Sequence, residues 1–410
     1  MDSVDEKRWT LEYPELGTGP VPLAPYVDPA QFELERQHVF RAVWLNVGRI
    51  EEVPRAGDYI VKEIEILNTS VIIVRRKDGG LSAFHNMCSH RGNRVAIERC
   101  GSARDFTCNF HGWVYGNDGR LLSVPDEDNF FGLCKEDLGL TPLALDTWEG
   151  FVFVNVNQQP SQSLQEFLGD YATSFAGFPF HEAPVCYSWS VEVNVNWKIA
   201  KDAFIEGYHV TSLHRRSVAQ LLATPSNQFA HSLSFNTYGP HQSTSAPGNF
   251  AAPQTAVGLS ARKYGAGIKR LRMADSLEEF NDLPPGVNPT RSADWMFDVT
   301  TVFPNMNIHY FRNNFTTYNF WPIAVDRTRW EVKQYYPSYQ DAGNLFAHEV
   351  GKVLFRDTVL EDLGTLERTQ SVLKSGAKDR FFLNDQEVLI RRFNKIIDDY
   401  VGAEGRLAAV

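Results

Sequence analysis

The pattern of hydrophobic and polar residues changes character along the 410-residue chain. Between residues 44 and 157, short runs rich in Val, Ile and Phe, such as DYIVKEIE, TSVIIVRR and GFVFVNV, are separated by turn signals at 78–80 and 117–119. Runs of this length and composition, bounded by Asp-Gly pairs, predict β-strands joined by tight turns. The segment is therefore predicted to be a small all-β module, followed by a linker at QQPSQS.

A helix is predicted just before the all-β module. Asp28 as N-cap, Pro29 in the first turn and Gln31 as the return partner of a capping box predict a helix start. This helix is expected to run to about Val43. The residues before it, rich in Pro and Gly, are expected to form an extended arm.

The remainder of the chain mixes both periods. Helices are predicted at 163–174, at 197–212 and after a capping box at 384–387; strands are predicted at 189–195 and 307–320. Residues 239–257, GPHQSTSAPGNFAAPQTAV, predict a long loop and a candidate lid.

Composition narrows the class of protein. A formal net charge of -10 gives no general attraction to polyanions, which argues against a nucleic-acid partner. No uninterrupted apolar run is long enough for a membrane span, and the charged N-terminus lacks a secretory signal. Five cysteines do not make a disulfide framework, so a reducing, cytoplasmic setting is expected.

Two loops of the all-β module each supply one cysteine and one histidine. HNMCSHRGNRV holds Cys88 and His90, and CNFHGWVYGNDGRL holds Cys108 and His111. Two thiolates and two imidazoles suit a tetrahedral zinc ion, or a [2Fe–2S] cluster with cysteines on one iron and histidines on the other. Because each loop mixes the two residue types, one loop can reach both irons, which favours the iron–sulfur cluster.

The spacing of these four residues resembles the Rieske motif C-x-H-x17-C-x-x-H. The flanking Gly92, Gly112 and Trp113 also resemble those of the Rieske domain in ring-hydroxylating oxygenases. The resemblance implies that the two cysteines and two histidines bind a Rieske [2Fe–2S] cluster. Cys100 and Cys134 lie outside the motif and are expected to be small buried apolar side chains.

A second cluster lies in FIEGYHVTSLH. His209 and His214 are five residues apart, which on an ideal helix separates them by about 140°. A shared metal therefore requires the helix to end or distort, with 211–212 as the expected place. Glu206 neighbours His209 at i and i+3, and Asp202 extends the same stripe as a further catalytic candidate. By themselves these residues suit either a metal site or ordinary polar positions on a helix.

The longer segment NWKIAKDAFIEGYHVTSLH resembles the catalytic segment of Rieske non-haem iron oxygenases. In that family two histidines and one carboxylate hold an iron that keeps open positions for dioxygen. The resemblance implies that His209 and His214 are ligands, and that the third is Asp362 in LEDLGTLERTQ. It also implies that Glu206, where most members have Asp, bridges electrons from His111 of one subunit to His209 of its neighbour.

The resemblance also implies a fold and a domain order. An α+β chain is expected, with an all-β Rieske domain and a helix-grip (START-like) catalytic domain built on an antiparallel sheet. Residues 1–43 would form an arm and a helix that pack on the catalytic domain. Residues 44–157 would form the Rieske domain, and 158–410 the catalytic domain of the mononuclear iron.

The implied function is that of a terminal oxygenase α subunit. It would use O₂ to dihydroxylate or monohydroxylate an organic, apolar or aromatic substrate. Electrons would come from NAD(P)H through a separate reductase, with or without a ferredoxin, because the chain has no convincing dinucleotide-binding Gly-rich loop. The family implies a homotrimer (α3), alone or with a β subunit (α3β3).

Three other functions stay open. A Rieske monooxygenase or demethylase would act on a small polar or quaternary-amine substrate. A Rieske electron carrier would need only the first module, and a zinc-binding protein would hold no sulfide.

The residues expected to line a substrate pocket are those near the histidines, together with one on a later strand: Phe204, Val210, Leu213 and His309.

Overall fold

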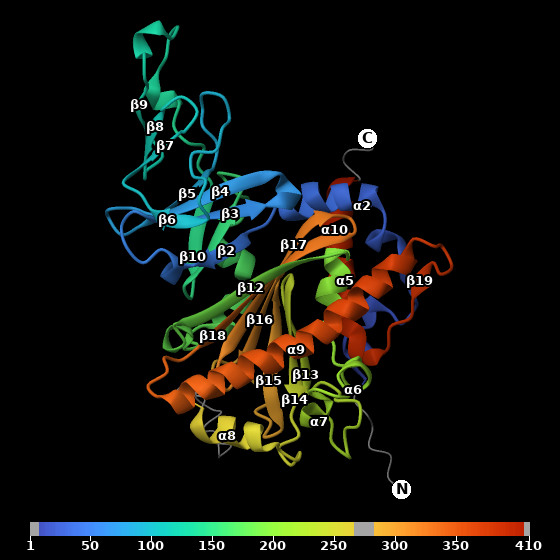
Figure 1. The fold of residues 1–410 in the computed structure, drawn as a ribbon. Helices are drawn as coiled ribbons and strands as arrows, with labels where there is room; N and C mark the ends of the chain where they lie inside the picture. Colours follow the sequence, from blue (N-terminus) through green and yellow to red (C-terminus); the bar gives the residue numbers. More distant parts are fainter. Residues whose placement is uncertain (1–7, 266–282, 406–410) are drawn as a thin grey trace. The chain divides into compact units, whose positions relative to one another are not determined.

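The computed structural model describes residues 8–265 and 283–405, which fold into two compact units (Figure 1). Residues 36–167 form the smaller unit, and residues 1–35 with 168–410 form the larger one. The chain thus divides at 35/36 and 167/168, whereas the sequence placed boundaries at 43/44 and 157/158. Within the described ranges, no helix is long and apolar enough to cross a membrane.

The smaller unit is built from three antiparallel sheets, and the predicted β-rich runs all form strands in it. The first sheet has the order β10-β11-β2, with β10 Ala144–Trp148, β11 Phe151–Asn155 and β2 Leu45–Arg49. The second has the order β5-β4-β3-β6, with β5 Leu81–His85, β4 Thr69–Arg75, β3 Asp58–Ile64 and β6 Cys100–Ser102. The third has the order β7-β8-β9, with β7 Asp105–Thr107, β8 Val114–Gly116 and β9 Leu121–Ser123.

The core of the smaller unit packs directly beneath the two cysteine loops. Cys88 and Cys108 belong to the same buried cluster as Phe84 and Tyr115. The predicted turn at 117–119 closes on this core. Gly119 has φ +83°, and a Cβ there would lie 2.3 Å from the ring of Phe84. Only glycine meets both the left-handed conformation and this close approach.

The larger unit is organised by one seven-stranded antiparallel sheet with the order β12-β18-β17-β16-β15-β14-β13. Its strands are β12 Val185–Val193, β13 Ser234–Tyr238, β14 His241–Pro247, β15 Trp295–Val302, β16 Met306–Phe311, β17 Phe315–Ala324 and β18 Arg327–Tyr336. A short two-stranded sheet pairs β1 Val21–Pro22 with β19 Arg380–Phe381. The α+β fold with an antiparallel sheet is therefore confirmed.

One long helix crosses a face of the seven-stranded sheet (Figure 1). This helix, α9, spans Ala342–Leu373. Val359 and Leu366 from α9 share a buried cluster with Phe320 of β17 and Trp330 of β18. The other α-helices within the described ranges are α1 Trp9–Glu12, α2 Pro29–Leu34, α3 Leu164–Leu168, α4 Asp170–Phe175, α5 Trp197–Asp202, α6 Val210–Leu213, α7 Ala219–Leu222, α8 Ala256–Tyr264 and α10 Val388–Gly405.

The two helix starts with predicted capping boxes differ in outcome. Before α10, the box between Asn384 and Glu387 is present as predicted. Before α2, Asp28 accepts a hydrogen bond from the N–H of Ala30 as an N-cap should. Gln31 donates instead to Glu35 on the next turn, so the predicted box at that start is wrong.

The first helix is also shorter than predicted, because α2 continues as a π-helix over Glu35–Phe40 and ends before Val43. Glu35 lies at this junction and is fully buried. It accepts hydrogen bonds from Lys198 Nζ at 2.5 Å and from Trp197 Nε1 at 2.8 Å. These contacts fix the N-terminal helix against α5 within the larger unit.

The loop predicted at 239–257, a candidate lid, is wrong at 241–247, which form a strand, and at 256–257, which begin α8. Gly239 and Pro240 form the turn of a hairpin in which Tyr238 pairs with His241, and the next residues form β14. The Ser- and Thr-rich composition suggested a loop, but these hydroxyls find buried partners inside the sheet. Ser245, for example, accepts from Ser234 at 2.8 Å and donates to Asp298 at 2.5 Å.

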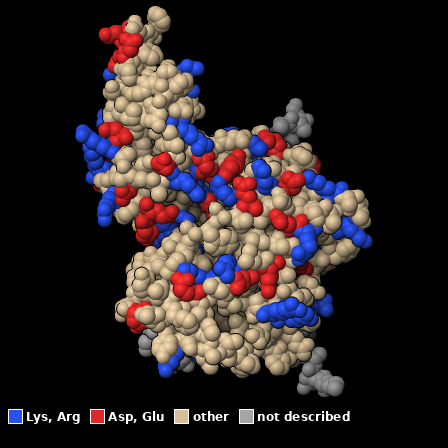
Figure 2. All heavy atoms as spheres, viewed as in Figure 1, with Lys and Arg blue, Asp and Glu red and all other residues tan. Residues whose placement is uncertain are grey.

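Two further predictions merged separate elements. The strand predicted at 307–320 is a hairpin of β16 and β17, and the helix predicted at 163–174 is divided into α3 and α4 by Gly169. On the face shown in Figure 2, basic and acidic side chains are interspersed. That face therefore presents no extended field of one sign.

Candidate metal centres and an apolar cavity

The two histidines of FIEGYHVTSLH lie at the two ends of a short helix. Helix α5 ends at Asp202, the chain is irregular from 203 to 208, and His209 and His214 are the N-cap and C-cap of α6. A single helix over 197–212, distorted at 211–212, is therefore a wrong prediction, because the break comes before His209. Glu206 explains the break, since its Oε2 accepts the backbone N–H groups of Tyr208 and His209.

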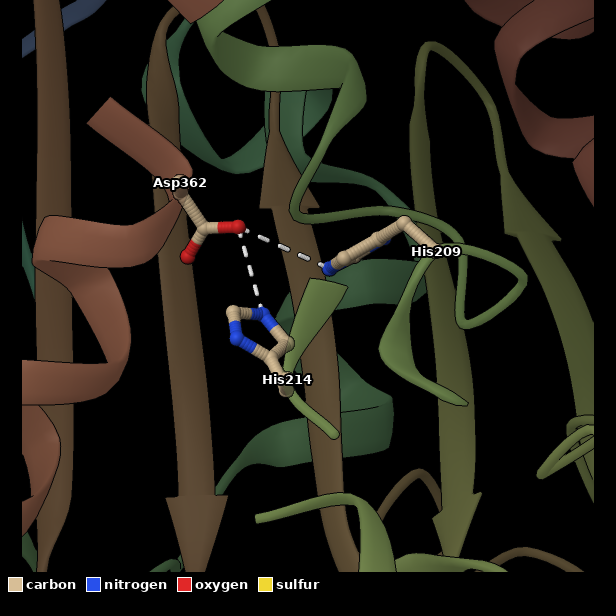
Figure 3. Close-up of side chains that lie close together, drawn as sticks. All are labelled: His209, His214 and Asp362. Atoms are coloured by element: carbon tan, nitrogen blue, oxygen red, sulfur yellow. Dashed lines mark ion pairs between the residues drawn. The ribbon is translucent and has the colours of Figure 1, made fainter. Parts of the chain in front are cut away.

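Helix α9 delivers a carboxylate to the same place. Asp362 Oδ1 lies 3.2 Å from His214 Nε2 and 3.7 Å from His209 Nε2. Figure 3 shows the three side chains converging, with both imidazoles facing the carboxylate. One ligand atom from each residue lies within 4.8 Å of the others. The predicted set of His209, His214 and Asp362 is thus brought together from two distant segments.

The three residues fit a metal ion. Asp362 is 2 % exposed, and its buried Oδ1 makes no contact of hydrogen-bond geometry with a described residue, although it lies close to both rings. A buried carboxylate oxygen without a hydrogen bond calls for another partner. Two imidazoles and one carboxylate on one side form the donor set of non-haem iron sites that keep open positions.

A second carboxylate lies behind each histidine. His209 Nδ1 forms a short contact with Glu206 Oε1, and His214 Nδ1 lies 2.7 Å from Glu361 Oε2. Burial lowers the pKa of His209, but the charges of Glu206 and Asp362 outweigh burial and raise it above its ordinary value. Burial lowers the pKa of His214 as well, and Asp362 and Glu361 together raise it.

A cavity of about 320 Å³ lies between α6, α9 and the sheet, and one part of its wall is formed by His209, His214 and Asp362. Most of its wall is apolar. Six aromatic rings line it: Phe204, Phe297, Phe311, Tyr318, Tyr336 and Phe355. Among the described residues that line the cavity there is no Lys or Arg. Such a cavity suits an apolar molecule and offers no cation for an anionic group.

Three of the four pocket residues predicted from sequence line the cavity. Phe204, Val210 and His309 line the cavity, but Leu213 does not and is only half-buried. Burial lowers the pKa of His309 to about 3, which keeps its ring neutral. Nε2 of His309 is buried and has no hydrogen-bond partner within the described ranges.

Asp202, a candidate catalytic residue, does not line the cavity. Because α5 ends at Asp202, the stripe expected to join it to Glu206 does not exist. Asp202 Oδ2 instead accepts a hydrogen bond from Tyr26 Oη at 3.0 Å. Burial raises the pKa of Asp202 to about 7. The structure thus places it at the end of α5 against Tyr26, half-buried and outside the cavity.

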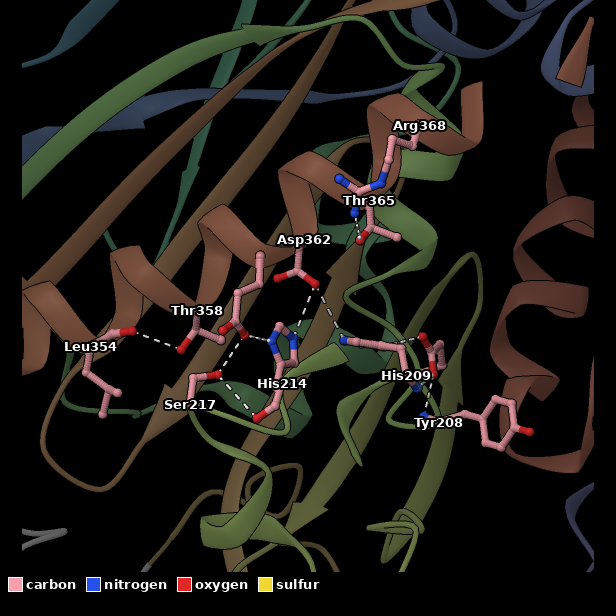
Figure 4. A network of polar contacts seen from close by, with 11 residues as sticks. Tyr208, His209, His214, Ser217, Leu354, Thr358, Asp362, Thr365 and Arg368 are labelled. Carbon is pink, nitrogen blue, oxygen red and sulfur yellow. Dashed lines mark hydrogen bonds and ion pairs between the residues drawn. The ribbon is translucent and has the colours of Figure 1, made fainter. Parts of the chain in front are cut away.

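Sequence reasoning missed several residues of the site. Met296 and Phe297 on β15 line the cavity from a segment with no recognisable pattern. Ser217 and Glu361, which do not line the cavity, both contact His214, and Figure 4 shows Ser217 beside it. Nothing in the sequence alone indicated that Glu361 reaches His214.

The two cysteine loops of the smaller unit have matching backbone geometry. The N–H of Gly92 donates to the carbonyl of Cys88, and that of Gly112 to the carbonyl of Cys108, both at 2.9 Å. The two glycines have φ values of +75° and +73°, which allow the chain to turn tightly after each histidine. The predicted pairing of the loops around one centre agrees with this geometry.

The side chains of the loops fit a cluster with mixed ligands. The rings of His90 and His111 lie 4.4 Å apart, and His90 stacks on Trp113. Nδ1 of His90 is buried without a hydrogen-bond partner among the described residues. Burial raises the pKa of Cys108, but hydrogen bonds from the Phe110 N–H and other donors outweigh burial, so the pKa is lowered. A stabilised thiolate is what iron binding requires.

Cys100 and Cys134 are both exposed, so the prediction that they are buried is wrong. Cys100 begins β6 at the edge of its sheet. Cys134 donates to Glu136 at 3.2 Å on the surface. Neither belongs to the buried cluster beneath the two loops.

Comparisons with known proteins agree with both centres. Residues 43–148 match the model of the Rieske [2Fe-2S] domain, and residues 180–403 match that of the ring hydroxylating alpha subunit (catalytic domain). The large oxygenase component of the naphthalene 1,2-dioxygenase system of Pseudomonas putida is 30% identical over 325 residues, which cover 73% of this chain and 67% of that protein. A solved naphthalene 1,2-dioxygenase from Rhodococcus sp. shares the fold, with a TM-score of 0.72 at 23% identity over 94% of this chain and 95% of that one.

Two other relatives match over shorter segments. The α subunit of biphenyl 2,3-dioxygenase of Rhodococcus jostii is 33% identical over 45% of this chain, and the oxygenase subunit of glycine betaine monooxygenase of Chromohalobacter salexigens is 32% identical over 48%. These alignments span 41% and 43% of the relatives' own lengths, less than half of each. The two family models nevertheless occur in order along one chain. The chain belongs to the ring-hydroxylating oxygenase α subunits, which combine a Rieske [2Fe–2S] domain with a non-haem iron catalytic domain.

Proposed function

We propose that the chain is the terminal oxygenase component of a Rieske oxygenase, which hydroxylates an apolar or aromatic substrate with O₂. The observation that carries this proposal is the convergence of His209, His214 and Asp362 on one wall of an apolar cavity. A donor set that leaves coordination positions open, next to space for an organic molecule, suits oxygen chemistry on a bound substrate.

Within this proposal, Cys88, His90, Cys108 and His111 hold the [2Fe–2S] cluster, and His209, His214 and Asp362 hold the mononuclear iron. When bound, the two groups supply stored electrons and a site for dioxygen activation. The protein's own contribution is positional. It presents Nε2 of both histidines and one carboxylate oxygen to the same point, and it surrounds the reacting space with apolar side chains.

The cavity wall supports an uncharged substrate. A substrate carboxylate would be buried without a Lys or Arg partner and near the carboxylates of Glu206 and Asp362. Burying an unpaired charge is costly, and a like charge nearby adds to the cost. Naphthalene and biphenyl, named for two relatives, lack such a group. Both dihydroxylation and monohydroxylation are compatible with the cavity.

A second candidate is a monooxygenase or demethylase for a quaternary amine. Six aromatic rings in the wall can face a trimethylammonium group, which aromatic faces attract. Relatives that act on glycine betaine and carnitine are among the matches. The carboxylate of such zwitterions, however, finds no Lys or Arg among the described lining residues. The cavity therefore favours the apolar substrate.

Product analysis decides between the two candidates. The protein is incubated with NADH, a Rieske-oxygenase reductase, ¹⁸O₂ and either naphthalene, biphenyl, glycine betaine or carnitine. We expect ¹⁸O in a hydroxylated product of an aromatic compound and no consumption of the zwitterions. Turnover of a zwitterion alone would favour the second candidate, and absence of ¹⁸O from every product would contradict oxygenation.

We also propose that Glu206 belongs to the electron path, as the resemblance implied. Its contact with His209 Nδ1 supports this role, because it places a carboxylate directly against an iron-ligand candidate. Glu206→Gln should retain both metal centres but slow reoxidation of the reduced Rieske cluster by O₂ and substrate at least about 10-fold. The measurement is single-turnover absorption spectroscopy.

The matched control for this experiment is Glu192→Gln, the same change at an exposed position on β12. It should reoxidise at the wild-type rate. A Glu206→Gln protein with full iron content and an unchanged rate would remove Glu206 from the electron path.

The proposed partners follow from the same chemistry. A separate NAD(P)H-linked reductase, with or without a ferredoxin, would supply electrons to the cluster. The proposed assembly is a homotrimer, alone or with a β subunit. The cytoplasmic setting inferred from the cysteine content stays a prediction.

A further inference from the structure

Glu361 and Ser217 form a closed set of hydrogen bonds with His214, at its Nδ1 and its backbone carbonyl. Its Nδ1 lies 2.7 Å from Glu361 Oε2, and the same oxygen accepts from Ser217 Oγ at 2.7 Å. Ser217 Oγ lies 3.3 Å from the backbone carbonyl of His214, and the N–H of Ser217 donates to that carbonyl at 3.0 Å. In Figure 4, Ser217 lies on the side of His214 away from Asp362.

Glu361 is distinct from the ligand set in its surroundings. Its side chain is 31% exposed, whereas that of Asp362 is 2% exposed. Glu361 does not line the cavity, so it does not touch a substrate there. Adjacent residues on α9 therefore reach the same imidazole from opposite sides, Glu361 at Nδ1 and Asp362 at Nε2.

We propose that Glu361 is a positioning residue for the mononuclear iron site, which fixes the ring orientation and tautomer of His214, and that Ser217 holds Glu361 in place. This inference rests on the proposed iron site. A neutral imidazole carries one N–H, and the partner at one nitrogen decides which nitrogen keeps a free lone pair. With the proton on Nδ1 shared with Glu361, Nε2 presents its lone pair towards Asp362 and the metal.

Each histidine thus has a glutamate carboxylate at its Nδ1, but the two glutamates come from different segments of the chain. Glu206 comes from the same segment as His209, and the proposed electron path uses it. Glu361 comes from α9, so it connects His214 to the helix that also supplies Asp362. The orientation of His214 and the position of Asp362 are thereby set by one rigid element.

The test measures iron affinity rather than turnover. Purified holoenzyme is titrated with an iron(II) chelator, and retained mononuclear iron is counted while the Rieske absorption serves as an internal standard. Glu361→Ala should weaken iron binding about 10- to 100-fold. Glu361→Gln keeps an oxygen that can accept from Nδ1–H, so it should fall between Glu361→Ala and wild type. Ser217→Ala should weaken binding less than Glu361→Ala.

The matched control is Glu349→Gln, the same change on α9 at a side chain that is 51% exposed and pairs with Lys352. It should bind iron as the wild type does. Equal iron affinity in wild type, Glu361→Ala and Ser217→Ala would overturn the inference. If Glu361→Ala fails to fold, an unchanged affinity in Glu361→Gln and Ser217→Ala would do the same.

Asp362→Ala separates this inference from the proposed function. If that variant loses the iron while both Glu361 variants bind it with wild-type affinity, only the positioning role fails. If Asp362→Ala also keeps the iron, the proposed site itself is wrong.

Discussion

The three carboxylates near the histidines differ in the ring nitrogen that they reach. Glu206 and Glu361 contact Nδ1 of His209 and His214, whereas Asp362 lies near Nε2 of both. Adjacent residues such as Glu361 and Asp362 are rotated by about 100° from each other on an ideal helix. That rotation is compatible with both residues touching His214, because the two nitrogens of its ring face different directions. Residue types and spacing alone do not reveal such an arrangement.

A buried acid outside the iron site makes a prediction about pH. Burial raises the pKa of Asp298 to about 7, although Ser245 and the Asn288 N–H donate to it. The folded state thus holds the proton more tightly than the unfolded state, whose ordinary pKa is 3.8. The contribution of Asp298 to the free energy of unfolding is therefore fully present below pH 4. It falls by about 1.4 kcal/mol per pH unit as the pH rises towards 7.

Asp298→Asn keeps one oxygen that can accept from the Asn288 N–H and carries no titrating group, so it should lose this pH dependence. We expect its Tm, relative to wild type, to rise steadily between pH 4 and 7 in thermal unfolding. The exposed Asp294→Asn serves as the control and should follow the wild type. Parallel curves for Asp298→Asn and wild type would contradict the assignment.

At the level of elements, the sequence predicted the parts whose signals are local. The β-runs of the smaller unit and the capping box before α10 depend on alternation and on neighbouring residues, and both are present. The break after α5 and the strand β14 were missed. Glu206 caps the backbone that follows it, and the hydroxyls of β14 find partners such as Asp298, which lies far along the chain. A partner that lies far along the chain cannot be recognised from a short stretch of sequence.

Two turns of the smaller unit test how far a turn glycine is fixed by its surroundings. Gly79 and Gly119 have similar φ values, +85° and +83°. A Cβ on Gly79 would meet nothing within 4 Å, whereas one on Gly119 would lie 2.3 Å from Phe84. Gly79→Ala should cost about 1–2 kcal/mol, the penalty of the left-handed conformation alone.

Gly119→Ala should cost clearly more, because the side chain of Phe84 must also move out of the core that contains Cys88. Chemical denaturation followed by the visible absorption of the Rieske cluster measures both variants. Equal losses of unfolding free energy at the two positions would show that the contact with Phe84 is relieved without cost.

For the whole molecule, the decisive inference was the order of two metal-binding patterns along one chain. The Cys and His loops and the three residues around α6 and α9 could each be placed by motif. The cavity could not, because its wall combines residues of α6, α7, α9 and several strands, among them Phe297 on β15. Substrate preference is therefore a property of the folded larger unit rather than of any single segment.

The most direct test of the central claim is the metal content of wild type and Asp362→Ala. The wild type should contain about three iron atoms for every two inorganic sulfides per chain, one iron more than the cluster needs. Asp362→Ala should lose that additional iron and keep the Rieske absorption and sulfide unchanged. An iron content equal to the sulfide content in the wild type, or the same excess iron in Asp362→Ala, would contradict the account.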